Sequence, residues 1–593
     1  MSHPLSAAPR IGADVAGQPL QTDVLVCGGG PCGLMLANEL GRRGIRCLVV
    51  DRKPGTAFNP QANATQARTM EHYRRLGFAH KVRAQGLPAD HPTDIAYLTR
   101  FAGHELARLR LPTARQATEV IKTMSGSWSA AELPHRVSQK FVEVVLREQA
   151  QAQASVELRY GWNLSDFDDD GTRVTARIAS VDGSQPGQTV QAHYMLAADG
   201  ARSGVRAKFG IEWEGVTGLK RNFMGGRMFA AYLRVPRFYE SNANDRAWMY
   251  VQVHPGLRSF IMSVDGVSEF AFHTQVPEGV DPDSLTADDA KRWFAQAYGN
   301  ATGEALEVEV LSTGHWLAGH ALVARELRRG RVFLGGDAAH LFTPTGGLGY
   351  NTAVEDAVNL GWKLAAVLRG EAPAALLDSY EPERKALALR NTAYARGFAD
   401  SIGLFDAVPE LDNDTPAGAA ARAVASEYLN GHARREFNIP GVTFGGRYDT
   451  SPVITHDNTP APPDAANSYA PNAKPGGRPP HLWLPDGRSL YDSFGFEWTL
   501  LVIDAPQPVD DARVQRFVDA AARYGAPLTV VRHALPELQA LYGAPLVLIR
   551  PDHIVAWRGG DAHAAEAVWA RVLGHDLERR HPGICSTSRA AWP

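Results

Sequence analysis

The sequence predicts an α/β protein of two or three domains, in which a βαβ unit is followed by a mostly antiparallel sheet and then by a smaller α/β domain. Three observations predict this. The chain has 593 residues, more than one hydrophobic core usually serves. Residues 24–51 run as apolar strand, glycine-rich turn, helix and second apolar strand. Beyond residue 210, runs rich in aromatic residues, Met and Val are separated by turns, which is typical of antiparallel strands.

Composition excludes several classes of protein. Hydrophobic residues make up 44% of the chain and charged residues 21%, and the net charge is -3. This balance gives no general attraction to nucleic acid or to anionic membranes. The chain has no apolar run of about 18 residues, and its first twenty residues lack the pattern of a secretory signal. We therefore expect a cytoplasmic protein without a membrane or nucleic-acid partner.

The four cysteines indicate neither a disulfide framework nor a metal site. Cys27, Cys32, Cys47 and Cys585 form no CxxC pair, and the chain has no HExxH motif or Cys/His cluster. Buried thiols in a reducing compartment are the expected state, and no metal is predicted.

The first βαβ unit predicts a dinucleotide site. Gly28, Gly30 and Gly33 follow the apolar run 24–27 in the spacing G-x-G-x-x-G, and the second apolar run ends on Asp51. These glycines permit a tight turn, close approach to a pyrophosphate, and close packing of helix on strand. Asp51 is placed to accept hydrogen bonds from a ribose. The alternative is a glycine-rich turn without a ligand.

Residues 331–364 indicate a second contact with the same ligand. A short apolar run, 332–334, ends on Gly-Gly-Asp with Asp337, and a glycine-rich loop at 346–350 precedes an amphipathic helix. No second G-x-G-x-x-G follows a strand. One tightly held dinucleotide contacted at both ends favours FAD over NAD.

Between these two segments the pattern predicts helices and strands in turn. Residues 67–77 and 139–151 have helical spacing, with Ser138 as the expected N-cap and with Gln139 and Glu143 on one face. Residues 156–183 are expected to form a β-meander, and the next strand ends on Asp199 and Gly200. Four strands follow near 228–235, 247–255, 258–266 and 269–276, and then a helix capped by Thr286.

The C-terminal third separates into a linker and a compact domain. Residues 451–480 are rich in Pro, Ala and Asn, as in a linker or an extended strap. The remaining residues alternate strand and helix patterns.

Three motifs in this order resemble a known family. They are "GGGPCG" with Asp51, "AADGARSGVR" and "GGDAAHLFTP". Together they resemble the single-component flavoprotein aromatic hydroxylases, the p-hydroxybenzoate hydroxylase and phenol hydroxylase group, over roughly residues 20–400. The resemblance implies a Rossmann-like FAD-binding domain (20–95, 130–210 and 320–400) with an inserted substrate domain (96–129 and 211–319). It also implies a helical segment and linker (401–480) and a thioredoxin-like domain (481–593), which lacks CxxC and so has no expected redox role.

The resemblance also implies the site residues. The cofactor set is Gly28, Gly30, Pro31, Gly33, Asp51, Arg52, Gln61, Arg68, Gln139, Asp199, Gly200, Gly336, Asp337, Pro344, Gly347, Leu348, Gly349 and Asn351. The substrate and catalytic candidates are Asn63, Arg227, Tyr250 and His254, with Tyr232 and Trp248 as further pocket candidates. His340, inside the Gly-Asp motif, is expected to support the flavin.

Two positions depart from the family pattern. Gln61 stands where many members have an arginine that contacts the FAD phosphates, and Asn63 stands where the phenol hydroxylase branch has an aspartate. Asparagine cannot act as a base, so Asn63 is expected only to orient the substrate, or another group removes the proton.

The resemblance implies a monooxygenase reaction. NAD(P)H would reduce FAD, and O2 would form a flavin C4a-hydroperoxide that hydroxylates a phenolic ring. A homodimer is expected. Two alternatives remain: an FAD enzyme of halogenase or oxidase type, although the halogenase signature W-x-W-x-I-P is absent, and a non-catalytic flavin- or ligand-binding protein.

Overall fold

The chain folds as two compact units. The structure is a computed structural model that describes residues 18–219, 221–299 and 306–580, so Cys585 and the segment before residue 18 lie outside the described residues. Unit 1 comprises residues 1–357, 387–444 and 464–469, and unit 2 comprises 358–386, 445–463 and 470–593. The domain limits expected from the sequence stay predictions.

The first sheet of unit 1 is the predicted Rossmann-like sheet, with strand order β16-β17-β8-β1-β2-β5. The strands along this path are β1 (Leu20–Cys27), β2 (Cys47–Asp51), β5 (Val156–Tyr160), β8 (Gln188–Ala197), β16 (Arg328–Arg329) and β17 (Val332–Leu334), and two more strands join the sheet through β8. β1 runs parallel to β2 and β8, β2 to β5, and β8 to β17. Ligands of such sheets bind beyond the carboxyl ends of the strands. The segments that follow β1, β2, β8 and β17 therefore define the edge where a cofactor is expected.

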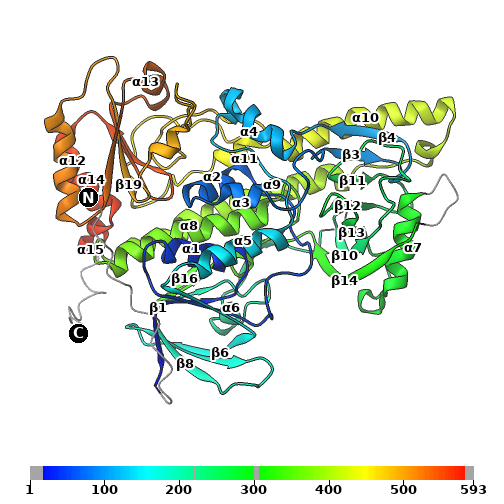
Figure 1. Cartoon of the computed structure of the whole chain (residues 1–593), viewed down its shortest axis with the longest axis horizontal. Helices are drawn as coiled ribbons and strands as arrows, with labels where there is room; N and C mark the ends of the chain where they lie inside the picture. The colour runs from blue at the N-terminus through cyan, green and yellow to red at the C-terminus, as the bar shows by residue number, and fades with distance from the viewer. Residues whose placement is uncertain (1–17, 220, 300–305, 581–593) are drawn as a thin grey trace. The chain divides into compact units, whose positions relative to one another are not determined.

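Helices cover this sheet, and further helices belong to the same unit. In Figure 1, α1 and α5 lie side by side over it, and they pack against each other. The helices of this part are α1 (Pro31–Gly41), α2 (Ala67–Arg75), α3 (Ala79–Arg83), α4 (Ala114–Thr123), α5 (Gln139–Gln151) and α6 (Gly204–Lys208).

One local prediction in this region was wrong and another was confirmed. β5 is not part of a meander, because it pairs in parallel with β2; the antiparallel run consists of β6 (Trp162–Asp169), β7 (Val174–Ser180) and β8. Ser138 is the N-cap of α5, as predicted, although its side chain makes no capping hydrogen bond. Extended backbone at Ser138 is enough to begin the helix, because Phe141 and Val142 donate their N–H groups to its carbonyl.

The second sheet is the predicted antiparallel layer, with order β14-β10-β13-β12-β11-β3-β4. Its strands are β3 (Ile95–Leu98), β4 (Glu105–Leu109), β10 (Gly226–Arg234), β11 (Met249–Gln252), β12 (Ser259–Ser263), β13 (Glu269–Gln275) and β14 (Glu309–Ala318). All pairs are antiparallel except β11 with β3. α7 (Ala287–Tyr298) begins at Thr286 with a capping box, as predicted, and Trp293 and Phe294 of this helix pack into the core on one face of the sheet.

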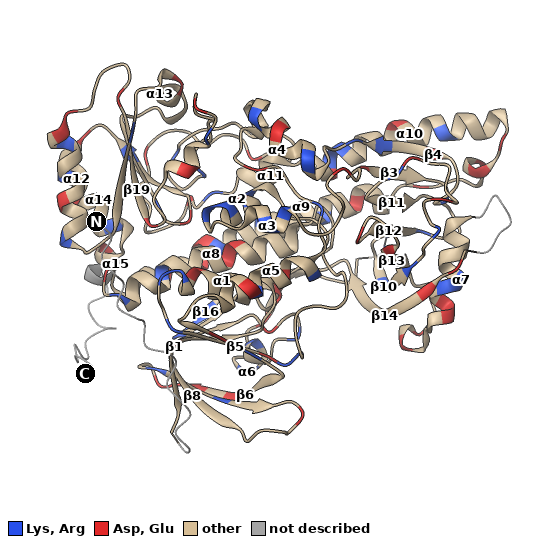
Figure 2. Cartoon of the chain, in the orientation of Figure 1, with Lys and Arg blue, Asp and Glu red and all other residues tan. Residues whose placement is uncertain are grey.

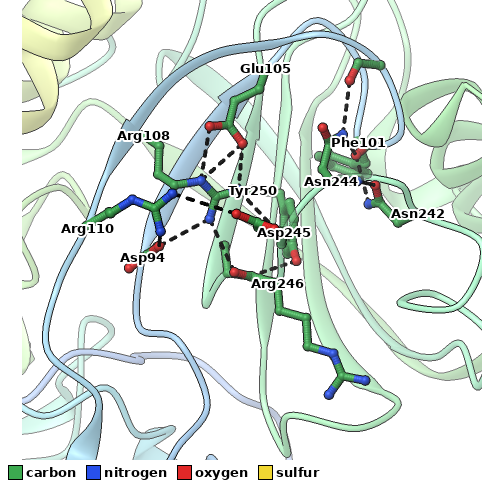
Figure 3. A network of polar contacts seen from close by, with 12 residues as sticks. Asp94, Phe101, Glu105, Arg108, Arg110, Asn242, Asn244, Asp245, Arg246 and Tyr250 are labelled. Atoms are coloured by element: carbon green, nitrogen blue, oxygen red, sulfur yellow. Dashed lines mark hydrogen bonds and ion pairs between the residues drawn. The ribbon is translucent and has the colours of Figure 1, made fainter. Parts of the chain in front are cut away.

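An ion network holds β4 at the edge of this sheet. Arg108 pairs with Glu105 at 2.6 Å and with Asp94 at 3.2 Å, and it donates to the carbonyls of Asp245 and Arg246 (Figure 3). The guanidinium is nearly buried, so these contacts fix the segment before β11 beside β3 and β4.

The remaining elements of unit 1 are a small sheet and a set of helices. The sheet has the order β18-β15-β9. The elements are β9 (Trp213–Val216), β15 (Ala321–Ala324), β18 (His340–Phe342), α10 (Pro416–Phe437) and α11 (Pro440–Phe444). Two long helices, α8 (Leu348–Leu368) and α9 (Tyr380–Gly403), contribute residues to both units.

Unit 2 contains the predicted C-terminal domain. Its sheet has the order β20-β19-β21-β22, with β19 parallel to β20 and the other pairs antiparallel, as expected of a thioredoxin-like fold. The elements are β19 (Trp498–Ile503), α12 (Asp511–Arg523), β20 (Leu528–His533), α13 (Pro536–Tyr542), β21 (Leu546–Ile549), β22 (Val555–Gly559), α14 (Ala565–Val572) and α15 (His575–Arg580).

Charge and hydropathy agree with the balanced composition. Figure 2 shows acidic and basic residues interspersed along the helices and loops of both units. Over residues 18–219, 221–299 and 306–580, every helix is too short or too polar to cross a membrane. The same described ranges hold no cluster of His, Cys, Asp and Glu suited to a metal ion.

Candidate active site

A first cavity lies beyond the carboxyl ends of the parallel strands. It has a volume of about 690 Å³, and we call it the dinucleotide cavity. Gly28 follows β1, Asp51 ends β2, Asp199 follows β8, and Asp337 follows β17; all four line it. The other predicted cofactor residues in its lining are Gly30, Pro31, Arg52, Gln61, Gln139, Gly200 and Gly336. Four separate segments of sequence therefore meet here because the strands that carry them are neighbours.

The three glycines of the first motif have different physical roles. Gly28 has φ +118°, and a Cβ there would lie 2.0 Å from the Ala198 carbonyl oxygen. A Cβ on Gly33 would lie 1.9 Å from the Gly28 carbonyl oxygen, so Gly33 brings α1 against the strand turn and does not line the cavity. A Cβ on Gly30 would meet no protein atom within 4 Å and would enter the cavity. Gly30 is also the N-cap of α1, whose free N–H groups suit a pyrophosphate.

Two acidic side chains fit sugar hydroxyls. Asp51 accepts hydrogen bonds from Gly29 N at 2.6 Å and from Lys53 N at 2.8 Å, which fix the carboxylate at the end of β2. Asp199 accepts from Val205 N at 3.3 Å through Oδ2, while its buried Oδ1 has no partner among the described residues. An unpaired buried acceptor that lines a cavity fits a ligand hydroxyl. Together with the glycine turn, these residues fit FAD.

Gln139 and Glu143 lie one turn apart on α5, as predicted. Gln139 Nε2 donates to Glu143 Oε1 at 2.7 Å, and Glu143 Oε2 accepts from Ala57 N at 2.6 Å. Burial raises the pKa of Glu143, and these hydrogen bonds partly offset the rise. The pair ties the loop after β2 to α5, with Gln139 facing the cavity.

A second cavity of about 770 Å³ adjoins the first, and we call it the aromatic cavity. It lies on one face of the antiparallel sheet, where Trp248, Phe260 and Trp316 line it. Five residues line both cavities: Gln61, Ala62, Arg202, Asp337 and Tyr350. A ligand in the dinucleotide cavity can therefore extend into the aromatic cavity past Asp337.

A glycine loop forms the boundary of the aromatic cavity. Pro344, Gly347, Leu348 and Gly349 line it, and α8 begins at Leu348. Gly346 and Gly347 both have φ +64°, and a Cβ on Gly347 would lie 2.9 Å from Ala64 Cβ. Bare backbone at this point, at the positive end of a long helix, suits an electron-rich ring edge.

Asn351 supports this loop from behind. It donates to the carbonyls of Ala64 at 2.9 Å and Gly347 at 2.6 Å, and it accepts from Gln66 N at 2.8 Å. Asn351 lines neither cavity. Arg68 is also buried away from both cavities, where it pairs with Glu71 at 3.3 Å. The structure therefore gives these two predicted cofactor residues no contact with either cavity.

Asp337 and His340 have different tasks. Asp337 is exposed toward the cavity, yet the surrounding protein desolvates its carboxyl and raises its pKa above the ordinary value; His340 and Lys53 partly offset this. His340 Nε2 contacts Asp356 Oδ2 at 2.7 Å, and the same oxygen accepts from Gly336 N at 3.1 Å. His340 thus holds the turn that presents Asp337, in keeping with the supporting role expected for it.

The catalytic candidates are divided by the faces of the antiparallel sheet. Asn63 lines the aromatic cavity, as do Tyr232 and Trp248. Arg227, Tyr250 and His254 do not line it, which corrects the position expected for them. Arg227 is an exposed residue of β10, outside the lining.

Tyr250 and His254 lie outside the aromatic cavity for separate reasons. Tyr250 is fully buried in the core on the opposite face of the sheet, and its hydroxyl accepts from Ala247 N at 2.8 Å (Figure 3). His254 contacts Asp412 and the guanidinium of Arg100, each at 3.1 Å. Neither side chain can reach a ligand in the aromatic cavity as the described chain stands.

Several lining residues were not predicted. Lys53 and Arg202 add positive charge to the dinucleotide cavity. In the aromatic cavity the missed polar residues include Tyr97, Arg136, His273, His432 and Glu436. Lys53 could have been found from its place beside Asp51, and Arg202 from its place in the AADGARSGVR motif. The others come from distant segments with no motif.

Comparison with known proteins agrees with this geometry. Residues 21–395 match the family model described as an FAD binding domain, and residues 472–575 match the one described as aromatic-ring hydroxylase, C-terminal. Aklavinone 12-hydroxylase RdmE of Streptomyces purpurascens is 33% identical over 93% of this chain and 99% of its own length. Phenol 2-monooxygenase of a Pseudomonas species is 29% identical over 91% and 90%. The structure of the rebeccamycin biosynthetic enzyme RebC with reduced flavin superposes with a TM-score of 0.81, at 32% identity over 94% of this chain and all of that one.

Proposed function

The chain belongs to the FAD-dependent aromatic-ring hydroxylases, and we propose that within this family it hydroxylates a phenolic ring of a substrate larger than phenol. The reductant in this proposal is NAD(P)H, and the oxygen atom comes from O2. That the protein is an FAD-dependent aromatic monooxygenase follows from the family. The homodimer, the cytoplasmic location and the absence of a nucleic-acid partner stay predictions.

The observation that carries the proposal is the continuity of the two cavities. The dinucleotide cavity has the acidic and glycine-rich features of an FAD site, and it opens past Asp337 into an aromatic cavity. A volume of about 770 Å³ lies within the range of about 300–1,000 Å³ typical of pockets for drug-sized ligands. The side chains of Ala230 and Ala231 are small, and with Gly314 they line the cavity, so β10 and β14 leave room above the sheet.

The proposed cofactor contacts follow from the positions of the residues. Bound FAD supplies the redox and oxygen-activating chemistry. Gly28, Gly30 and Pro31 would surround the pyrophosphate, and Asp51 would bind the ribose. Asp199 and Asp337 would accept hydrogen bonds from further hydroxyls. The remaining contacts would come from Arg52, Gln61, Gln139, Gly200, Gly336, Pro344, Gly347, Leu348 and Gly349.

In this proposal the chain also orients the substrate. Phe260, Trp248 and Trp316 give the aromatic cavity an apolar floor that favours a flat ring system. Asn63 is buried, its Nδ2 makes a long contact of 3.4 Å with the Pro60 carbonyl, and its Oδ1 has no partner in the described chain. We infer that Asn63 Oδ1 accepts a hydrogen bond from the substrate hydroxyl, which orients the phenol without deprotonating it.

The test is oxygen transfer by the purified FAD enzyme. It would receive NADH or NADPH, isotopically labelled O2 and a series of phenols with one, two and three rings. We expect faster NAD(P)H consumption with the larger phenols and a product heavier by one labelled oxygen atom. Stimulated NAD(P)H oxidation that yields only hydrogen peroxide across the series would contradict the proposal.

A further inference from the structure

One buried charged side chain in the aromatic cavity has no hydrogen-bond or ion-pair partner among the described residues. Arg136 is 6% exposed, lies three residues before Gln139, and lines the cavity. Its guanidinium carbon lies 4.6 Å from the ring centre of Trp248 and 5.8 Å from that of Phe437. Across the described chain, no carboxylate lies within ion-pair distance of Arg136 and no acceptor takes a hydrogen bond from its five N–H groups.

Other buried arginines of unit 1 show how unusual this is. Arg258 donates to the carbonyls of Ile402 and Phe405, and Arg221 pairs with Asp400 at 2.6 Å. A buried charge without hydrogen bonds is costly, so an unpaired guanidinium beside a cavity points to an acceptor supplied from within that cavity. Burial lowers the pKa of Arg136 to about 10, so the group stays cationic at neutral pH.

No neighbouring side chain supplies the acceptor that Arg136 lacks. Glu436 accepts from Gly346 N at 3.0 Å through Oε1 and contacts His432 Nε2 at 2.9 Å through Oε2. Both of its oxygens are therefore engaged by other groups, and Arg136 feels it only through space. Tyr97 lines the same cavity against His432, with ring centres 5.9 Å apart, and its hydroxyl makes no hydrogen bond within the described residues.

We propose that Arg136 recognises an anionic oxygen of the substrate, so the protein selects acidic aromatic compounds over neutral ones of the same shape. This inference rests on the proposed function and names the substrate class more closely. The oxygen could belong to a carboxylate or to an ionised enol or phenol, since a guanidinium fork binds either one. The Trp248 ring covers one side of the guanidinium, so the anion would bind at an N–H edge that faces the cavity.

The test compares matched acidic and neutral ligands by isothermal titration calorimetry with the FAD-loaded enzyme. One arm pairs 3-hydroxy-2-naphthoate with its methyl ester, and the other pairs 2-hydroxy-1,4-naphthoquinone with its methyl ether. We expect at least one acid to bind about tenfold to a hundredfold more tightly than its neutral partner, as hydrogen bonds to charged groups imply. The arm with the larger ratio identifies the kind of anion.

Two variants decide whether Arg136 causes this preference. Arg136→Met should remove the preference while the FAD content and the melting temperature stay near those of the wild type, and Arg136→Lys should keep part of it. Arg227→Met is the matched control, because it removes one positive charge from the same unit outside the cavity, and it should keep the full preference. Equal binding of acid and neutral ligand by the wild type in both arms, or a preference that survives in Arg136→Met, would overturn the inference.

Product formation separates this inference from the proposed function. Hydroxylation of acid and ester with equal efficiency would leave the monooxygenase standing and would overturn selection by Arg136. An Arg136-dependent binding preference without any oxygenated product would support the recognition and overturn the proposed reaction.

Discussion

At the scale of single residues, four carboxylates do most to define the site. Asp51, Asp199 and Asp337 each end or follow a strand of one sheet, so their separation in sequence becomes proximity in space. Glu436 comes from α10 and bonds to the backbone of the glycine loop. The first three were predicted because each ends an apolar run, and Glu436 was not, because it lies inside a helix of mixed character.

Asp337 is the strongest single test of cofactor binding. Asp337→Ala should give a folded protein whose FAD affinity is lower by about tenfold to a hundredfold, because a hydrogen bond to a charged group contributes about 1.5–3 kcal/mol. Flavin content after gel filtration would measure this. Asp182→Ala, at an exposed turn of the same unit, should retain FAD; equal flavin content in both variants would refute the role of Asp337.

His273 makes the stability of the fold depend on pH. Trp316 donates to His273 Nδ1 at 3.2 Å, so the neutral ring carries its proton on Nε2. Burial lowers the pKa of His273 from 6.5 to about 4. Between these two pKa values His273 is protonated in the unfolded chain and neutral in the folded protein. The free energy of unfolding therefore falls as pH falls through this range, by up to about 1.4 kcal/mol per pH unit.

His273→Gln should remove this contribution while keeping an acceptor for Trp316. Urea unfolding at pH 6.5, 5.5 and 4.5 would show a shallower loss of stability in the variant than in the wild type. Other buried histidines such as His135 contribute equally to both proteins. Parallel slopes would show that His273 does not titrate in this range.

At the scale of elements, the contact of α1 with β1 determines the geometry of the dinucleotide cavity. The helix begins at Pro31, and its buried face carries Leu34, Leu36 and Leu40. The helix can lie this close only because the position that meets the Gly28 carbonyl oxygen is Gly33. Gly33 thus permits close packing of the helix on the strand turn, and Gly30 leaves space for the ligand.

Alanine substitutions separate these two roles. Gly33→Ala places a Cβ 1.9 Å from backbone and should lower the free energy of unfolding by roughly 1–3 kcal/mol or more, with loss of FAD. Gly30 has extended backbone, and a Cβ there would meet no protein atom within 4 Å. The Gly30→Ala variant should therefore unfold near the wild-type temperature yet bind FAD weakly. Thermal unfolding of the FAD-free proteins and flavin titration measure the two effects. Equal stability of the two variants would contradict the assignment.

At the scale of the whole molecule, a buried ion network joins distant parts of unit 2. Glu383 of α9 pairs with Lys363 of α8 and with Arg550 just after β21, each at 2.7 Å, and all three side chains have no exposed surface. Asp552 pairs with Arg550 at 2.6 Å. The basic partners hold the pKa of Glu383 far below its usual range against the effect of burial. Residues 167 positions apart are thereby held in one compact unit.

Glu383→Gln should destabilise unit 2 strongly, because it leaves two buried cations short of negative charge. Loss of one partner of a buried pair costs about 3–5 kcal/mol. Glu566→Gln is the control, since its pair with Arg523 is exposed and contributes about 1 kcal/mol or less. Chemical unfolding followed by tryptophan fluorescence would compare them; similar midpoints for the two variants would contradict a central role for the network.

The predictions failed where two faces of one sheet had to be distinguished. Alternation along β10 places Met228 and Tyr232 on one face and Phe229 and Leu233 on the other, but it does not say which face lines a cavity. Arg227 and Tyr250 were therefore chosen on the wrong side. The β5 strand was misread for a related reason, since its pairing with β2 depends on a partner 109 positions away in register.

The sequence by itself determined the cofactor half of this protein. Glycine spacing, acids at strand ends and helix starts are short-range features, and each specifies a local backbone geometry wherever it occurs. Only the tertiary structure decided the substrate half. Arg136, Trp248, His273 and Glu436 meet in one cavity because α5, the antiparallel sheet and α10 pack around it. Such packing depends on the complementarity of whole surfaces, which no single stretch of the chain encodes.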